Sequence, residues 1–175
     1  TGTTMDYEMI GGTHELLPNT TLQQLMHQNL TEVGGITYTQ DEKTFADKIA
    51  KSMGDDMADA ETAKTVQPYK DKAKASGSTD VGDVSFKVPT VGMRTATWVP
   101  GTPAHSWQAV AAGGTSIGKK GMMVAAKTLA LTAIDLFENE KIVQDAKNEF
   151  MERRGADFEY IPLLGDRAPA LDYRE

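Results

Sequence analysis

The spacing of hydrophobic residues predicts two helices in the first third of this chain. Apolar positions recur with helical periodicity over residues 22–33, between a start signal at Asn19 and a stop signal at Gly34. A second helix is expected from Thr39, because Glu42 stands three residues later as the partner in a capping box. The buried face of this second helix is predicted to consist of Phe45, Ala46, Ile49 and Met53.

The most apolar helix is predicted from about Thr115 to Phe137. Its hydrophobic residues point in nearly every direction around the helix axis, and such a helix is normally packed between two layers of structure. A further amphipathic helix is expected over residues 140–153, followed by an irregular tail that contains two prolines. The C-terminal third is therefore predicted to be mainly helical.

Other segments have the composition of β-strands. Residues 5–10 and 13–16 read as one interrupted strand, and residues 84–88 and 90–99 are rich in Val, Thr and aromatic residues. Between these segments, residues 54–76 are polar and charged, which favours a surface loop with a short helix over a mobile lid. The combination of strands and helices predicts an α/β fold.

The composition narrows the class of protein. With 175 residues, 39% of them hydrophobic, the chain is long enough to bury a core of its own. A formal charge of −7 argues against nucleic acid and anionic membranes as partners, and the absence of cysteine excludes disulfides and thiolate metal sites. The most apolar run, residues 121–137, is interrupted by Lys127 and Asp135 and is too short to span a bilayer.

These features together predict a soluble, cytoplasmic protein. The chain opens at Thr1 rather than at a methionine and enters the first strand pattern directly. We therefore expect it to be part of a longer protein.

His105 is the leading candidate for chemistry. It lies in a turn rich in glycine and proline, directly after a predicted strand, and imidazole is the commonest metal ligand. A catalytic metal site needs about three protein ligands, and the nearest partners of the right type are Asp80 and Asp83. The alternative is a structural hydrogen bond, which is also the interpretation that we favour for His14 and His27.

Two glycine-containing loops are weaker candidates. Residues 77–83 carry two carboxylates that would share a helical face, although Asp and Gly are also ordinary turn residues. Residues 113–116 stand at a helix start, where free N–H groups either are capped by a threonine or serine side chain or bind the carboxylate of a substrate. A Ser–His–Asp triad is not expected, because His105 and Ser106 are adjacent in the chain.

The same segments resemble a known family. Residues 77–85 (GSTDVGDVS), 89–107 (PTVGMRTATWVPGTPAHSW) and 113–118 (GGTSIG) are similar to the C-terminal part of M20-family metallopeptidases, and most similar to the amidohydrolases related to aminobenzoyl-glutamate utilization protein B. The resemblance continues through the long apolar helix to residues 169–174 (PALDYR) and covers essentially the whole chain.

This resemblance implies a fold and a division of the chain. The fold would be the C-terminal half of a zinc-peptidase-like (phosphorylase/hydrolase-like) α/β catalytic domain, in which helices flank a mixed sheet. Residues 1–18 would be the last strand of an inserted lid or dimerisation domain, and residues 19–175 would belong to the catalytic domain.

The resemblance also implies a site. Members of the family hold two divalent metals, zinc or manganese, which activate water for attack on an amide. His105 matches the family's last metal ligand, whereas Ser78, Thr79 and Asp80 match a loop near the substrate pocket. Gly114 and Thr115 would lie on the same rim. Arg94 is a weaker candidate for substrate contact, and the interpretation that we favour for it is a solvated or salt-bridged arginine.

The family's other ligands and its general base lie in an N-terminal half that has no counterpart in this chain. We therefore expect part of a metal-dependent amidohydrolase for an N-acyl or aminobenzoyl-glutamate-like amino acid, inactive alone and with no catalytic residue of its own beyond the metal ligand. Its partners would be a small amide substrate and either a second copy or the missing half. The alternative is a non-catalytic module for assembly or regulation, favoured by the long apolar helix.

Overall fold

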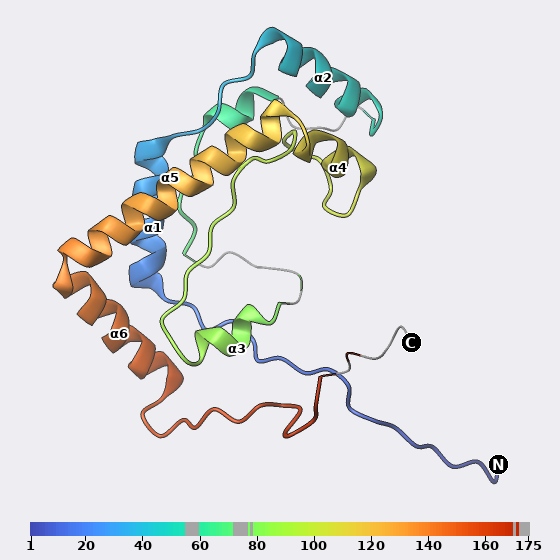
Figure 1. The fold of residues 1–175 in the computed structure, drawn as a ribbon, viewed down its shortest axis with the longest axis vertical. Helices are drawn as coiled ribbons and strands as arrows, with labels where there is room; N and C mark the ends of the chain where they lie inside the picture. Colours follow the sequence, from blue (N-terminus) through green and yellow to red (C-terminus); the bar gives the residue numbers. More distant parts are fainter. Residues whose placement is uncertain (55–59, 72–76, 78, 170, 172–175) are drawn as a thin grey trace.

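Helices are the only regular elements in the part of the chain that the structure, a computed structural model, describes: residues 1–54, 60–71, 77, 79–169 and 171 (Figure 1). In chain order the elements are α1 (Thr20–Val33), α2 (Gln40–Lys51), the 3-10 helix η1 (Ala60–Lys64), α3 (Val81–Ser85), α4 (Trp107–Gly113), α5 (Ser116–Glu138) and α6 (Glu140–Arg154).

The prediction of an α/β fold with a mixed sheet is therefore wrong. Residues 1–18, expected to include the last strand of a lid domain, lie outside every helix and strand, and so do residues 90–99. Val84 and Ser85 belong to α3 instead of a strand. A β-strand is stable only beside another strand, and no two described segments pair in this way.

The two helices predicted in the first third of the chain are confirmed as α1 and α2, and their capping groups explain their limits. The Asn19 side chain accepts a hydrogen bond from the N–H of Leu22, and Gly34 ends α1 with a positive φ of 79°. In α2 the side chains of Thr39 and Glu42 form the reciprocal bonds of a capping box.

The main hydrophobic cluster lies where α2, η1 and the start of α5 meet the loops that carry Ile36 and Val99. It consists of Ile36, Tyr38, Ala46, Ile49, Ala63, Val99 and Ile117, with Phe45 and Met53 packed against it. A polar contact extends this packing, because the buried Asn29 amide on α1 donates to Thr132 at 3.2 Å and to Asp135 at 2.7 Å on α5.

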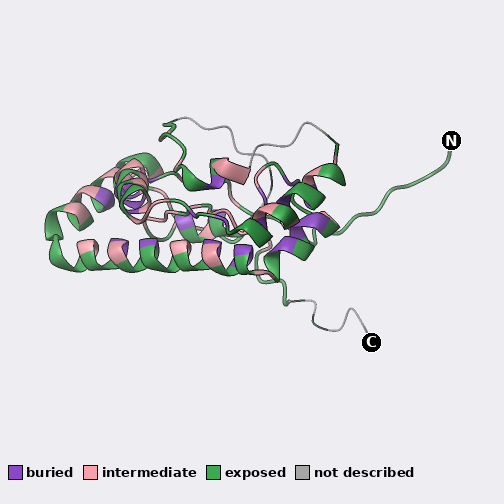
Figure 2. Ribbon diagram, turned by 90° about the horizontal axis from the view of Figure 1, so that it is seen from above, coloured by how far each residue is buried: buried purple, intermediate pink, exposed green. Residues whose placement is uncertain are grey.

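Helix α5 confirms the predicted helix but not its expected burial between two layers. One side is buried, including Ile117, Gly118 and Gly121, and a Cβ at Gly121 would lie only 2.4 Å from the carbonyl oxygen of Ala96. The opposite side faces outward along one edge of the molecule (Figure 2). Among the described helices, α5 included, none combines the length and apolarity needed to cross a membrane.

The extended segments at the two ends of the chain meet at α3. The His14 ring packs against Phe86, Phe158 and Tyr160, with ring centroids 5.1–6.2 Å apart. The backbone N–H of Leu17 donates to the buried Ser85 hydroxyl at 2.8 Å. His14 thus has the structural role that the sequence suggests, and the division of the chain at residue 18 stays a prediction.

Candidate functional site

The loop before α4 holds His105 in an uncommon backbone conformation. Its φ is +61°, and it is the only non-glycine residue with a positive φ in the described part of the chain. Such a conformation costs on the order of 1–3 kcal/mol and persists only where the neighbouring structure fixes it. It is therefore an observed outlier that supports a functional interpretation of this loop.

Capping interactions fix the loop on both sides of His105. The N–H of the buried Thr102 donates to the carbonyl of Val99 at 3.1 Å. The Ser106 hydroxyl donates to the carbonyl of Pro103 at 2.7 Å and accepts from the N–H of Ala109 at 3.2 Å, so it caps α4. The His105 side chain is exposed and takes no part in these bonds. These bonds therefore fix the backbone at His105 without using its imidazole.

The loop predicted to lie near a substrate pocket is placed at α3. The Thr79 hydroxyl accepts from the N–H of Val81 at 3.3 Å, and Asp80 occupies the N-cap position without a side-chain capping bond. Ser78 lies outside the described residues. Asp83 is used structurally, because its carboxylate accepts from the Tyr160 hydroxyl at 2.8 Å and from the N–H of His14 at 3.4 Å.

The predicted site residues form two separate groups. His105, Gly114 and Thr115 belong to the loops on either side of α4, whereas Thr79 and Asp80 lie at α3 in another part of the molecule (Figure 1). Within the described ranges no three His, Asp or Glu side chains come close enough to hold a metal ion. The described residues therefore do not make a metal centre by themselves, and His105 as a metal ligand stays a prediction.

The start of α5, proposed as a carboxylate site, already faces a carboxylate of this chain. The Thr115 hydroxyl caps the helix by accepting from the N–H of Ile117 at 3.2 Å. The Ser116 hydroxyl donates to the Glu42 carboxylate at 2.6 Å. Capping, the simpler interpretation of residues 113–116, is thus observed, and substrate binding by Gly114 and Thr115 remains a prediction.

Glu42 joins α2 to α5 through a buried ionic cluster. Its carboxylate also accepts from the Lys120 ammonium and from the N–H of Thr39, both at 2.6 Å. Burial alone would raise the pKa of Glu42, but the hydrogen bonds from Lys120, Ser116 and Thr39 outweigh it and lower the pKa to about 2. Burial and the nearby Glu42 raise the pKa of Tyr38 to about 12. Glu42 is therefore ionised at neutral pH and acts as a structural anchor.

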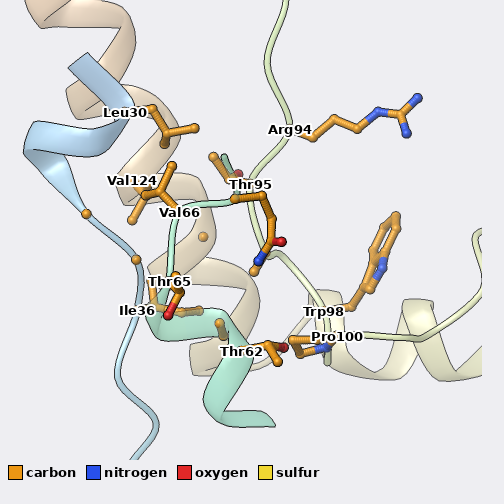
Figure 3. A pocket seen from close by; sticks show the side chains of 16 residues that line it. Leu30, Ile36, Thr62, Thr65, Val66, Arg94, Thr95, Trp98, Pro100 and Val124 are labelled. Carbon is orange, nitrogen blue, oxygen red and sulfur yellow. The ribbon is translucent and has the colours of Figure 1, made fainter. Parts of the chain in front are cut away.

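Two cavities meet at Arg94. The first, of about 510 Å³, is mainly apolar and includes Leu30, Val66, Trp98 and Val124 in its lining. Figure 3 shows Leu30, Val66 and Val124 gathered at one end of this cavity, while the Arg94 guanidinium extends away from them. Its shape and lining suit an aromatic or aliphatic group.

The second cavity, of about 640 Å³, is more polar, and its lining includes Lys70, Arg94 and Arg153. Arg153 is already paired with Glu149 at 2.9 Å, whereas Arg94 has no hydrogen bond or ion pair within the described part of the chain. An unpaired guanidinium between an apolar and a polar cavity is suited to an aromatic compound that carries a carboxylate. His105, Thr79, Asp80, Gly114 and Thr115 do not line either cavity.

Comparison with known proteins finds a relative that supports the family resemblance seen in the sequence. It aligns with 97% of this chain at 34% identity. That relative is one of the subunits of the p-aminobenzoyl-glutamate hydrolase of Escherichia coli (strain K12). The chain spans 40% of the length of this hydrolase subunit. No family model and no solved structure matches the chain.

The similarity to the hydrolase subunit confirms the resemblance seen in the sequence.

The sequence did not reveal the cluster in which Ser116 and Lys120 bind Glu42, because both residues are more than seventy positions away from Glu42 in the chain. The capping-box spacing revealed Glu42 but not its distant partners. The two cavities were missed too, since their walls come from segments throughout residues 16–153.

Proposed function

We propose that this chain is part of an M20-type amidohydrolase that cleaves the amide bond of an N-acyl or aminobenzoyl-glutamate-like amino acid. The observation that carries the proposal is the 34% identity to a p-aminobenzoyl-glutamate hydrolase subunit over 97% of the chain. The exposed His105, held at a positive φ by bonds that do not involve its imidazole, supports it.

The cofactor would be a divalent metal, zinc or manganese. His105 would supply one ligand, and the other ligands and the general base would come from another region of a longer protein or from a second polypeptide. A partner of this kind agrees with the name of the relative, which describes it as a subunit of a hydrolase. This chain alone would then be inactive.

The substrate would use the two cavities that meet at Arg94. An aromatic acyl group fits the apolar cavity, and the Arg94 guanidinium would bind a carboxylate of the amino-acid part. A specificity site of this kind contributes binding energy without taking part in bond cleavage.

The test measures hydrolysis of p-aminobenzoyl-glutamate by the longer protein that contains this chain. His105→Ala is expected to lower kcat at least about a hundredfold, since removal of a ligand disrupts the site, and Arg94→Met is expected to raise KM with a smaller change in kcat. Val110→Ala, an exposed position on the adjacent α4, is the matched control and should leave both constants unchanged. Full turnover in the His105 variant would contradict the ligand assignment.

The second candidate function is a non-catalytic module for assembly. The exposed apolar side of α5 favours it. Under this alternative His105→Ala affects neither turnover nor assembly, so the same measurement separates the two functions.

A further inference from the structure

Helix α5 and the backbone of residues 94–98 touch at Gly121. Gly121 is buried, and a Cβ atom at this position would lie 2.4 Å from the carbonyl oxygen of Ala96 and 2.9 Å from the Cα atom of Thr97. Real Cβ atoms essentially never approach another atom within 3.0 Å. Because the atoms that it would meet belong to the backbone, no side-chain rotation relieves the overlap. The direct contact between α5 and this segment therefore requires glycine.

Packing, more than backbone hydrogen bonding, holds this segment in place. Within the described part of the chain, residues 90–94 take part in no backbone hydrogen bond, and the N–H of Thr97 donates only to the carbonyl two residues before it, at 2.9 Å. Ala96 packs against the main hydrophobic cluster. The packing of Ala96 on Gly121 therefore contributes to the position of Arg94, two residues earlier in the chain.

The same segment forms one wall of the apolar cavity. Arg94 and Trp98 stand two residues before and two residues after Ala96, and both line the cavity, to which α5 contributes Gly121 and Val124. Figure 3 shows Arg94 and Trp98 projecting from one loop, with Val124 on the opposite side. A movement of the Ala96 backbone away from α5 would therefore displace both side chains.

We propose that Gly121 is a positioning residue for the substrate: its lack of a side chain allows residues 94–98 to pack directly on α5, and this packing places Arg94 and Trp98 in the lining of the cavity. Gly121 acts through these two residues and not by contact with a reacting atom. The inference rests on the proposed function for its class of ligand, an aromatic compound that carries a carboxylate.

The size of the expected disturbance follows from the distances. Ordinary contact begins at 3.4 Å, so the carbonyl oxygen of Ala96 would have to move by about 1 Å in the Gly121→Ala variant. A misplacement of about 1 Å can cost an enzyme as much as about a hundredfold in rate. In the proposed binding mode Arg94 and Trp98 hold parts of the substrate away from the bond that is cleaved, so we expect the loss mainly in KM.

Steady-state hydrolysis of p-aminobenzoyl-glutamate by the longer protein that contains this chain is the first test. Gly121→Ala should raise KM about tenfold and change kcat by less than about threefold. The matched control is Gly118→Ala, one turn earlier on α5: a Cβ atom there would lie 2.2 Å from the carbonyl oxygen of Gly113, and Gly118 lines neither of the two cavities beside Arg94. The control should lower the thermal stability to a similar extent and leave KM unchanged. An unchanged KM in Gly121→Ala, or the same rise in both variants, would overturn the inference without affecting the proposed function.

Calorimetric titration of the same proteins with p-aminobenzoate separates the inference from the proposed function. Gly121→Ala should weaken binding about tenfold, and Gly118→Ala should not. This result would support the inference even if the unmodified protein failed to hydrolyse the amide, an outcome that would contradict only the proposed function. Absence of binding to the unmodified protein, or equal affinity in Gly121→Ala, would overturn the inference.

If circular dichroism shows that Gly121→Ala does not fold, Thr97→Gly tests the same placement without steric overlap. Glycine frees the backbone next to Ala96, so Arg94 and Trp98 should be held less firmly and the affinity for p-aminobenzoate should fall. Thr97 lines neither cavity, and unchanged affinity in this variant would overturn the inference.

Discussion

The junction around Glu42 and the loop around His105 place ionisable side chains in opposite settings. The Glu42 side chain is 7% exposed and binds Ser116, Lys120 and Thr39. His105 is exposed, and its backbone is strained. The Glu42 carboxylate is fully hydrogen-bonded and so is not free to react, whereas the His105 imidazole is unbound within the described part of the chain and accessible, at a cost in backbone conformational energy. This difference in burial and bonding distinguishes Glu42, a structural group, from His105, a candidate functional group.

The largest expected effect on stability follows from neutralising Glu42. Glu42→Gln should lower the free energy of unfolding at pH 7 by about 3 kcal/mol, because it removes the charge that Lys120 and Ser116 bind. Urea unfolding followed by circular dichroism measures the change. Glu61→Gln is the matched control: Glu61 is 42% exposed and pairs with Lys43 and Lys64, so its loss should cost much less than the loss of Glu42. Equal losses would contradict the distinction.

Protonation of Glu42 at low pH should weaken its contacts between α2 and α5 in a defined pH range. The folded state lowers the pKa of Glu42 from 4.5 to about 2. Its stabilising contribution is therefore complete above about pH 4.5 and is lost as the pH falls toward 2. Glu149 behaves alike: burial would raise its pKa, but hydrogen bonds from Thr21 and Thr20 lower it to about 2.

Urea midpoints measured between pH 2 and 7 check this expectation. Glu42→Gln should flatten the curve between pH 2 and 4.5, with the remaining slope due to Glu149 and Glu61, whose pKa values are also lowered. A variant curve parallel to that of the unmodified chain would mean that Glu42 does not stabilise the fold through its charge.

The smallest expected change in stability comes from substitutions at His105 and tests whether its backbone is strained. His105→Gly should raise the free energy of unfolding by about 1 kcal/mol, because glycine adopts a φ of +61° without strain. His105→Ala keeps the Cβ atom and should change stability by less than about 0.5 kcal/mol. Thermal unfolding of the three chains distinguishes these outcomes. A loss of stability in the glycine variant would show that the imidazole itself stabilises the loop.

The helices could be predicted from the sequence because their signals are local. Asn19, the Thr39–Glu42 capping box and Thr115 each lie within three residues of the N–H group that they bind. The presence of strands could not be predicted from local signals, since a strand requires a neighbouring strand that composition does not reveal. Val84, which fits a strand by its β-branched side chain, is in α3.

The candidate site was predictable in part for the same reason. The position of His105 in a loop follows from nearby glycine and proline residues, whereas the short helix α4 that begins at Trp107 was not predicted. The positive φ of His105 does not follow from the sequence, because only a few per cent of non-glycine residues adopt a positive φ, even though histidine is enriched among them. The separation of Asp80 from His105 and the cavities beside Arg94 depend on long-range packing.

Trp107 gives the His105 loop an optical reporter. Its indole is 64% exposed and lies two residues after His105, in the first turn of α4. The other tryptophan, Trp98, lines the apolar cavity, and Trp98→Phe would leave a single emitter. The fluorescence of that variant would then report divalent ions that reach the His105 loop, in real time and without any turnover of substrate.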